Sequence, residues 1–216
     1  MMAKPAERKY DFKKEYKDLY LPKEKPMLID VPEMNFIMVN GTGDPTGESY
    51  QDAMQVLYSL TFTIKMSKMS GKQPEGYFDY VLPPLEGLWW SPEGSLNLEE
   101  RSEWQWISMI RQPDFVTPEV FEWAVRECRE KKPGIDVSRA RLERFTEGLC
   151  VQTMHIGPYA QEQSSMARME EFISREGLIS ESGLVRKHHE IYLGDPRKTA
   201  PERLRTVLRT PVRRGE

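Results

Sequence analysis

Hydrophobic and polar residues along the chain recur with two periods, one typical of α-helices and one typical of β-strands. The order of the helical and strand segments occurs twice. An apolar stripe at helical spacing runs over 50–69, and a second runs over about 161–176. Short runs with the alternation or continuous apolar character of strands surround them. Strands are predicted at 35–39, 103–113, 149–156, 187–193 and 204–211. The apolar segment 78–90 contains two prolines and a glycine, which indicates a bent or interrupted strand.

This pattern therefore predicts a strand, a helix and two further strands in each half of the chain. The tetrapeptide Ile110–Pro113 in the first half resembles Leu208–Pro211 in the second, and Gly43–Pro45 takes the place of Gly157–Pro158 at the turn into the helix. We interpret this order as a degenerate duplication. Thr117, followed by proline, is a typical helix cap and starts a helix that connects the two halves.

The predicted fold is α+β, with two strand-helix-strand-strand modules that form one curved antiparallel sheet. Both main helices are expected on one face of the sheet. The other face is expected to curve into a ligand groove at the pseudo-twofold axis. The predicted parts are an N-terminal arm and lead-in (1–34) and a single domain (35–212), made of a first module (about 35–116), a connecting helix (about 117–133) and a second module (about 140–212).

The strand at 187–193 carries an unusual combination of side chains. Alternation places Ile191 and Leu193 on one face, and His188, Glu190 and Tyr192 on the other. If the second face is exposed to solvent, Glu190 is an ordinary surface residue. If it lines a cavity, its carboxylate is partly desolvated and can receive a cation or a proton.

The first half contains a segment in the equivalent position. This segment, Glu86–Trp90, is expected to line the groove together with the strand that carries Glu190. Trp104 and Trp106 share one face of another strand, and at least one of them is expected in the core.

The charge of the chain is unevenly distributed. Between Asp30 and Glu103 there are 12 acidic and 4 basic residues, whereas the whole chain has a net charge of −3. A nucleic-acid-binding protein usually shows a basic stripe instead. The acidic first half therefore favours cationic or neutral ligands, although a solvated surface explains most of these carboxylates equally well.

Cysteine, histidine and glycine usage predicts neither a metal nor a cofactor. The two cysteines and three histidines lack metal-ligand spacing, and the glycines at 41–47 lack the pattern of a dinucleotide or phosphate loop. The charged N-terminus does not resemble a secretory signal, and no apolar run reaches the roughly 18 residues of a membrane span. These features predict a cytoplasmic protein in a reducing compartment.

Several separated motifs resemble those of the GyrI-like small-molecule-binding family. They are Leu142–Gln152, His155–Tyr159 and His189–Leu193, in that order, and Pro84–Trp90 resembles the counterpart motif of the stand-alone bacterial members. The resemblance covers about 36–212.

The resemblance implies a duplicated module with a ligand groove, and a strand glutamate, here Glu190, that meets the ligand among aromatic side chains. The predicted ligand-binding residues are Glu190, Tyr192, His188, Glu86, Trp89, Trp90, Tyr159 and Trp104. Family members often form the effector-binding half of multidrug-responsive transcription factors. Because 1–34 is too short and too poor in aliphatic residues for a helix-turn-helix, we expect no DNA binding by this chain.

Three functions follow from these observations. The first is a cytoplasmic binder that takes up or sequesters lipophilic, planar aromatic and cationic small molecules. The second is a hydrolase of cyclopropane-bearing alkylating natural products, which some stand-alone family members are reported to be, with Glu190 as general base. The third is a structural or partner-binding domain, in which Glu190 would be exposed. The sequence predicts no membrane partner and leaves a homodimer open.

Overall fold

The computed structural model describes residues 9–93, 101–183 and 185–215. Residues 1–8 of the predicted arm and residues 94–100 of the predicted first module lie outside the described residues. The strands are β1 (Met27–Thr42), β2 (Leu85–Trp90), β3 (Gln105–Arg111), β4 (Ala140–Ile156), β5 (Leu178–Ser180), β6 (His188–Tyr192) and β7 (Arg205–Arg214). The α-helices are α1 (Phe12–Glu15), α2 (Lys17–Tyr20), α3 (Glu48–Lys65), α4 (Pro118–Lys131) and α5 (Gln163–Arg175). Short 3-10 turns are η1 (Ser67–Ser70), η2 (Arg101–Glu103), η3 (Val137–Arg139), η4 (Tyr159–Gln161) and η5 (Pro201–Arg203).

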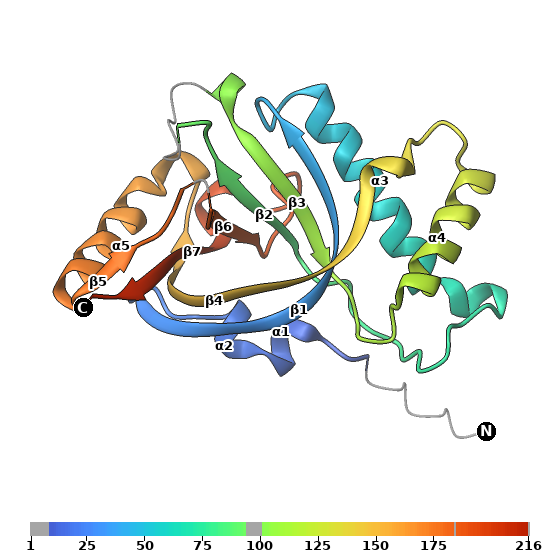
Figure 1. The fold of residues 1–216 in the computed structure, drawn as a ribbon, viewed down its shortest axis with the longest axis horizontal. Coiled ribbons are helices and arrows are strands. Elements are labelled where there is room, and N and C mark those ends of the chain that lie inside the picture. The colour runs from blue at the N-terminus through green and yellow to red at the C-terminus, as the bar shows by residue number, and fades with distance from the viewer. Residues whose placement is uncertain (1–8, 94–100, 184, 216) are drawn as a thin grey trace.

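The strands form one antiparallel sheet that closes on itself. Its order is β4-β1-β3-β2-β6-β7-β5, and β4 also pairs with β7. Exchanging β1 with β4, β2 with β6 and β3 with β7 leaves the cyclic order unchanged, as two related halves require. The prediction of a curved antiparallel sheet is confirmed, and the curvature is large enough to make a barrel (Figure 1).

The long helices lie outside this barrel. Helix α3 packs on the outer face of β1 and β3 through a cluster that includes Ile37, Val39 and Ile110. Helix α5 packs on the outer face of β4 and β7 through Val151 and Leu208. Helices α3 and α4 lie at one end of the sheet and α5 at the other (Figure 1). The prediction that the main helices share one face is therefore confirmed.

The inner face of the barrel is filled by side chains. A cluster of buried residues there includes Phe36, Met38, Leu88, Met109, Ile191 and Val207. The N-terminal arm adds Phe12, Leu19 and Tyr20 to the same cluster. Because β1 is buried on both faces over 36–39, this part of the chain reads as a continuous apolar run.

Tertiary contacts hold the N-terminal arm, because α1 and α2 have only four residues each and cannot be stable alone. The Gln152 side chain donates to the carbonyl of Asp18 at 2.6 Å, and the Thr153 hydroxyl donates to the carbonyl of Glu24 at 2.7 Å. The Arg209 guanidinium also donates to the carbonyl of Leu19. The arm is therefore fastened to the barrel strands β4 and β7.

Three element boundaries differ from the predictions. Strand β4 starts at Ala140, nine residues before the predicted strand. Strand β5 was not predicted at all. Strand β2 begins only at Leu85, because the two prolines before it cannot donate to a ladder of backbone hydrogen bonds.

Candidate functional site

The outer face of β2 and β6 carries the side chains around Glu190. Strand pairing places Glu190 opposite Gly87 and His188 opposite Trp89, so these residues share one face. That face is the one on which α3 packs, because Trp89 and Tyr192 belong to the α3 cluster. The predicted groove on the face opposite the helices is therefore wrong. That opposite face is the filled interior of the barrel.

A chain of hydrogen bonds leads to the Glu190 carboxylate. The Trp89 indole donates to the Tyr192 hydroxyl at 3.0 Å, and the Tyr192 hydroxyl donates to Glu190 Oε2 at 2.7 Å. His188 Nε2 lies 3.4 Å from the other carboxylate oxygen. The side chain of Glu190 is 16% exposed, so the carboxylate is largely but not fully removed from water. Burial, followed by the charge of Glu190, raises the pKa of Tyr192 well above its ordinary value.

Aromatic rings from several elements surround this carboxylate. Tyr50 on α3 stacks on Trp89 with ring centroids 5.8 Å apart, and Tyr159 in η4 meets Tyr192 edge-on at 5.8 Å. Tyr50 also meets Trp106 edge-on at 5.0 Å. Tyr159 is 39% exposed, which leaves one ring of this group accessible from solvent. We call Glu190 and its surrounding groups, including Glu162 described below, the Glu190 site.

Two glycines make room for the indoles of the site. A Cβ atom at Gly87 would lie 2.6 Å from the Trp89 indole nitrogen, and one at Gly41 would lie 2.1 Å from the Trp106 ring. Contacts this short do not occur in proteins, so a side chain at either position would displace an indole. Both glycines therefore help to shape the site, because they leave room for the two indole rings.

Glu162 is a second carboxylate at the site. It lies between η4 and α5, and its Oε1 is buried near the side chain of Thr206. Burial, followed by the negative charge of Glu190, raises the pKa of Glu162 to about 9, while neighbouring Thr206 acts in the opposite direction. At neutral pH Glu162 is therefore a neutral carboxylic acid. The sequence analysis missed it, although its spacing of three from Tyr159 puts both on one side of a helical turn.

The structure brings five of the eight predicted site residues to the outer face, namely Glu190, Tyr192, His188, Trp89 and Tyr159. Trp104 lies behind them, because it packs edge-on against Trp89 with centroids 5.6 Å apart. Whether any of these residues contacts a ligand stays a prediction.

Glu86 and Trp90 do not reach the outer face, which corrects the expectation that the whole segment lines the groove. Glu86 is fully buried on the inner face, where it accepts a hydrogen bond from Tyr20 at 3.1 Å. Alternation puts Trp90 on the same side of β2 as Glu86, and the Lys187 ammonium lies 4.9 Å from the centre of its ring.

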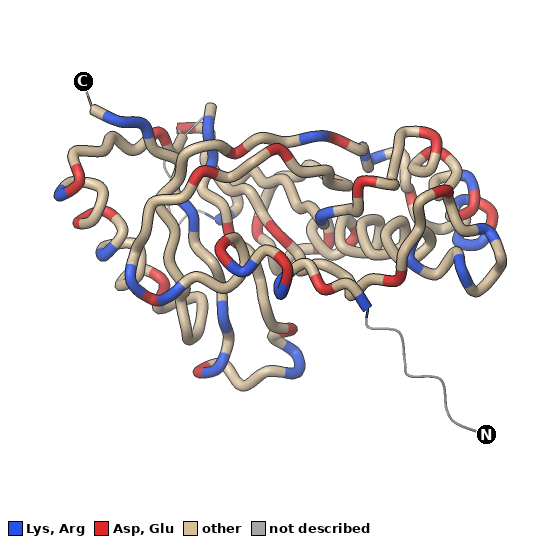
Figure 2. Tube along the Cα trace, turned by 90° about the horizontal axis from the view of Figure 1, so that it is seen from below, with Lys and Arg blue, Asp and Glu red and all other residues tan. Residues whose placement is uncertain are grey.

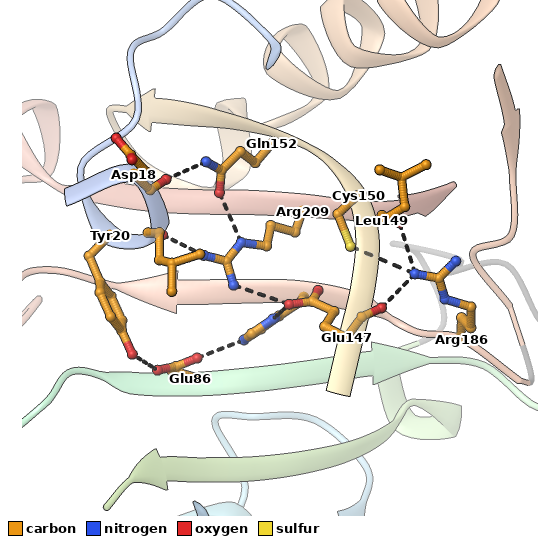
Figure 3. A network of polar contacts seen from close by, with 11 residues as sticks. Asp18, Tyr20, Glu86, Glu147, Leu149, Cys150, Gln152, Arg186 and Arg209 are labelled. Atoms are coloured by element: carbon orange, nitrogen blue, oxygen red, sulfur yellow. Dashed lines mark hydrogen bonds and ion pairs between the residues drawn. The ribbon is translucent and has the colours of Figure 1, made fainter. Parts of the chain in front are cut away.

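Glu86 belongs to a polar network inside the barrel, which Figure 3 shows. His189 bridges two carboxylates, with Nε2 at 3.0 Å from Glu86 and Nδ1 at 2.9 Å from Glu147. Arg209 contacts Glu147 at 3.1 Å and donates to Gln152 at 2.9 Å. We call Tyr20, Glu86, Glu147, Gln152, His189 and Arg209 the interior network.

The side chains of the interior network stabilise one another's charges, as water would do at the surface. Burial alone would raise the pKa of Glu147, but His189 and Arg209 outweigh burial and lower it to about 2. Burial alone would lower the pKa of His189, but Glu147 and Glu86 raise it to about 9. At neutral pH both side chains are therefore charged in an interior that excludes solvent.

Sequence comparison agrees with this geometry. A family model described as GyrI-like small molecule binding domain matches residues 24–213, nearly the whole chain. The chain belongs to the GyrI-like family. The resemblance inferred from the motifs is thereby confirmed, and the protein contains a small-molecule-binding domain.

The GyrI-like domain is similar to solved structures from Listeria innocua. An uncharacterized conserved protein from this organism is 56% identical, with a TM-score of 0.92 over 95% of this chain and 100% of that chain. A hydrolase from the same organism is 55% identical, with a TM-score of 0.88 and the same coverage. The EcmrR C-terminal domain is 12% identical with a TM-score of 0.51, over 88% of this chain and 98% of that chain, so it shares the fold alone. No curated protein matches the sequence significantly.

Over 9–93, 101–183 and 185–215, no helix is long and apolar enough to cross a membrane. Within the same ranges, no group of three or more His, Cys, Asp and Glu side chains is arranged to hold a metal ion. Acidic and basic positions are interspersed along the trace in Figure 2, without a long stripe of one sign in that view.

Proposed function

We propose that the GyrI-like domain binds lipophilic, planar aromatic cations at the Glu190 site, as a cytoplasmic multidrug binder. The observation that carries this proposal is the partly exposed Glu190 carboxylate, which lies among aromatic rings of α3, β2, η4 and β6. The basic side chain in contact with Glu190 is the imidazole of His188 at 3.4 Å, and no Lys or Arg of the described chain forms an ion pair with Glu190 or Glu162. A ligand is therefore the natural source of positive charge for this site.

Simple energetics support a cationic ligand and predict that ligands of different shape can bind. A carboxylate about 4 Å from a cation contributes on the order of 4 kcal/mol at an intermediate dielectric, before its desolvation cost is subtracted. Each aromatic face adds about 0.5–2 kcal/mol to a cation placed over it. Together with apolar burial these terms reach the roughly 8 kcal/mol of micromolar affinity. Since few directional hydrogen bonds are needed, ligands of different shape can bind.

Glu190→Gln tests the proposal directly, because it keeps the shape of the side chain and removes its charge. We expect the variant to bind a cationic planar dye at least tenfold more weakly, on the order of 1.4 kcal/mol, and a neutral dye of similar size about as well as before. Intrinsic tryptophan fluorescence reports binding of both dyes. Glu170→Gln, at an exposed position of α5, is the matched control. Equal losses for the two dyes would show that the charge is not what binds.

The two adjacent tryptophans should respond differently to substitution. We expect Trp89→Phe to weaken dye binding several-fold, because Trp89 is the donor to Tyr192 and stacks on Tyr50. Trp90→Phe should leave affinity unchanged, because Trp90 lies on the other side of β2 beside Lys187. Fluorescence titration of each variant with the same cationic dye measures this difference. A stronger effect at Trp90 would contradict the placement of the site on the outer face.

Hydrolysis is a second candidate, because a Listeria innocua relative of 55% identity is a hydrolase. The site also combines a carboxylate with Glu162, a carboxylic acid whose pKa is about 9. In this reaction Glu190 would take a proton from water, and the hydroxyl would bond to one cyclopropane carbon while a ring C–C bond at that carbon breaks. Glu162 would protonate the atom that receives the electron pair of the broken bond. Incubation with a cyclopropane-bearing alkylating natural product should then give a product heavier by one water. Glu190→Gln should abolish that product, and wild-type protein that binds the compound without changing its mass would exclude this candidate.

A further inference from the structure

We propose that His188 determines which positive charge occupies Glu190: its protonated imidazole pairs with the carboxylate in acid, and its neutral form leaves the carboxylate to a cationic ligand. His188 is then an internal competitor for the ligand. This inference rests on the proposed function, because it describes the regulation of that same site. It predicts a site that binds cations at neutral and alkaline pH and releases them as the pH falls.

The two carboxylate oxygens of Glu190 have different partners. Oε2 accepts a hydrogen bond from the Tyr192 hydroxyl at 2.7 Å, and that hydroxyl accepts one from the Trp89 indole at 3.0 Å. Because an indole N–H can only donate, the hydroxyl proton of Tyr192 stays directed at Glu190. Oε1 faces His188 Nε2 at 3.4 Å, which is longer than an ordinary hydrogen bond. Oε1 is therefore the oxygen that remains for a positive charge.

His188 is fixed beside this oxygen. Strand pairing places it opposite Trp89 on the outer face, and its side chain is only 8% exposed. Its other ring nitrogen, Nδ1, is buried and has no hydrogen-bond partner among the described residues. A protonated imidazole carries two N–H donors and a positive charge. The Glu190 carboxylate is the anion in contact with that charge, so it stabilises the protonated ring where the ring already lies.

Protonation of His188 and binding of a cation therefore compete. A positive charge about 4 Å from a carboxylate contributes on the order of a thousandfold in affinity at an intermediate dielectric. When the imidazolium neutralises the carboxylate, a second cation gains little and meets a like charge, so the imidazole must first release its proton to the buffer. While the ring is protonated, affinity for a cation falls by up to about tenfold per pH unit. Histidine is the side chain whose ordinary charge change lies between pH 5 and pH 8.

Other ionisable groups around the carboxylate keep their protons over this range. Burial is the largest of the causes that raise the pKa of Tyr50 on α3 and of Tyr159 in η4 to about 12. Burial also raises the pKa of Tyr58, and raises that of Tyr192 well above its ordinary value. Burial, followed by the charge of Glu190, raises the pKa of Glu162 to about 9. None of these side chains therefore changes its charge between pH 5 and pH 8.

Charged groups at the edge of the site have partners of their own. Hydrogen bonds from Arg197 lower the pKa of Asp195 to about 2, so this pair stays ionised. The Arg101 guanidinium and the Lys187 ammonium lie over indole rings, 5.6 Å and 4.9 Å from the ring centres. The pH therefore acts on the charge of the site through His188 and, in more acidic solution, through the carboxylate itself.

Ethidium and Nile red are suitable probes, because both are planar and fluorescent and neither changes its charge between pH 5.5 and pH 8. Ethidium is a cation and Nile red is neutral. We expect wild-type protein to bind ethidium at least tenfold more tightly at pH 8 than at pH 5.5, and Nile red about equally at the two values. Fluorescence titration measures both affinities.

Two substitutions fix the charge at this position. His188→Gln cannot be protonated, so its ethidium affinity should keep only the weaker pH dependence that the carboxylate itself contributes. His188→Lys carries a permanent charge, so it should bind ethidium at pH 8 at least tenfold more weakly than the wild type does. Both variants should bind Nile red as the wild type does, which verifies that the site is intact, and thermal unfolding verifies the fold.

Proton NMR observes the competitor directly, because the chain contains only three histidines. The resonance that is missing in His188→Gln identifies His188. By reciprocity of linked binding, saturating ethidium should move the titration of this resonance to lower pH by about one unit or more. The resonances of His155 and His189 should not move. A residue that acts only through packing gives no such shift.

The outcomes separate this inference from the proposed function. If neither dye binds wild-type protein, the proposed function fails and this inference fails with it. If both dyes bind but His188→Gln retains the full pH dependence of ethidium binding, the proposed function stands and the competing role of His188 is refuted. If His188→Gln weakens both dyes equally, His188 acts through packing, which also overturns the inference.

Discussion

Replacing Glu147 with glutamine should lower the free energy of unfolding by about 3–5 kcal/mol, the range for breaking a buried ion pair by removing one partner. Glu147 is the carboxylate that meets both His189, at 2.9 Å, and Arg209, at 3.1 Å. The Arg209 side chain is fully buried. Without the carboxylate, two positive charges face each other in the interior of the barrel with no anion between them.

Urea unfolding followed by circular dichroism measures this change. Glu143→Gln is the matched control, because Glu143 lies on the same strand with its side chain 43% exposed. Its ion pair with Arg141 is an exposed one, so the control should cost less than about 1 kcal/mol. Similar losses in the two variants would show that the interior network does not stabilise the fold through its charges.

The interior network also explains why the N-terminal arm belongs to the folded unit. Tyr20 donates to Glu86, and the arm carbonyls of Asp18 and Leu19 accept from Gln152 and Arg209 (Figure 3). The arm therefore satisfies polar groups that would otherwise be buried without partners. Its helices need no stability of their own, because the barrel provides their contacts.

Local pattern was sufficient to predict much of the fold. Alternation alone placed His188, Glu190 and Tyr192 on one face, and the structure keeps them together around the carboxylate. The repeat of element order predicted two related halves, and the cyclic strand order has the symmetry that such halves require. These features depend on residues that are close together in the sequence or on the order of segments along it, and one sequence is enough to show both.

Features that depend on closure of the sheet were not predictable in this way. The sequence does not reveal that β4 pairs with both β1 and β7, so its pattern predicts an open groove on the face that is the interior of the barrel. The misplacement of Glu86 has a different cause. Alternation within β2 already separates Glu86 from Trp89, and applying it residue by residue would have placed Glu86 inside.

Glu162 was missed because its character arises only in three dimensions. In the sequence it is one of many glutamates near the start of a helix, where a carboxylate is usually favourable. Its high pKa depends on burial and on Glu190 from a strand that follows it by 28 positions. A signal existed in the spacing from Tyr159, but nothing local marks that turn as part of a site.

Deprotonation of His189 should by itself destabilise the protein on the order of 3 kcal/mol between about pH 6.5 and about pH 9. Glu147 and Glu86 hold the pKa of His189 at about 9 in the folded protein, against burial, whereas an unfolded histidine titrates near 6.5. A pKa that folding raises gives stability that is complete below 6.5 and is lost as the pH rises through the folded value. Tyr20 on the arm, whose pKa burial raises further above its ordinary value, keeps its proton over this range.

Glu162 should contribute in the same direction, and its part can be separated. Its pKa of about 9 in the folded protein exceeds the usual carboxyl value, so the folded state retains a proton that the unfolded state has already released. We therefore expect urea midpoints of the wild type to fall from about pH 6.5 to about pH 9, and those of Glu162→Gln to fall less steeply. The double variant Glu162→Gln and His189→Gln should lose most of the remaining slope, because neither group can then titrate. A wild-type midpoint that stays constant over this range would mean that His189 is not charged inside the barrel, and the interior network would then need a different distribution of protons.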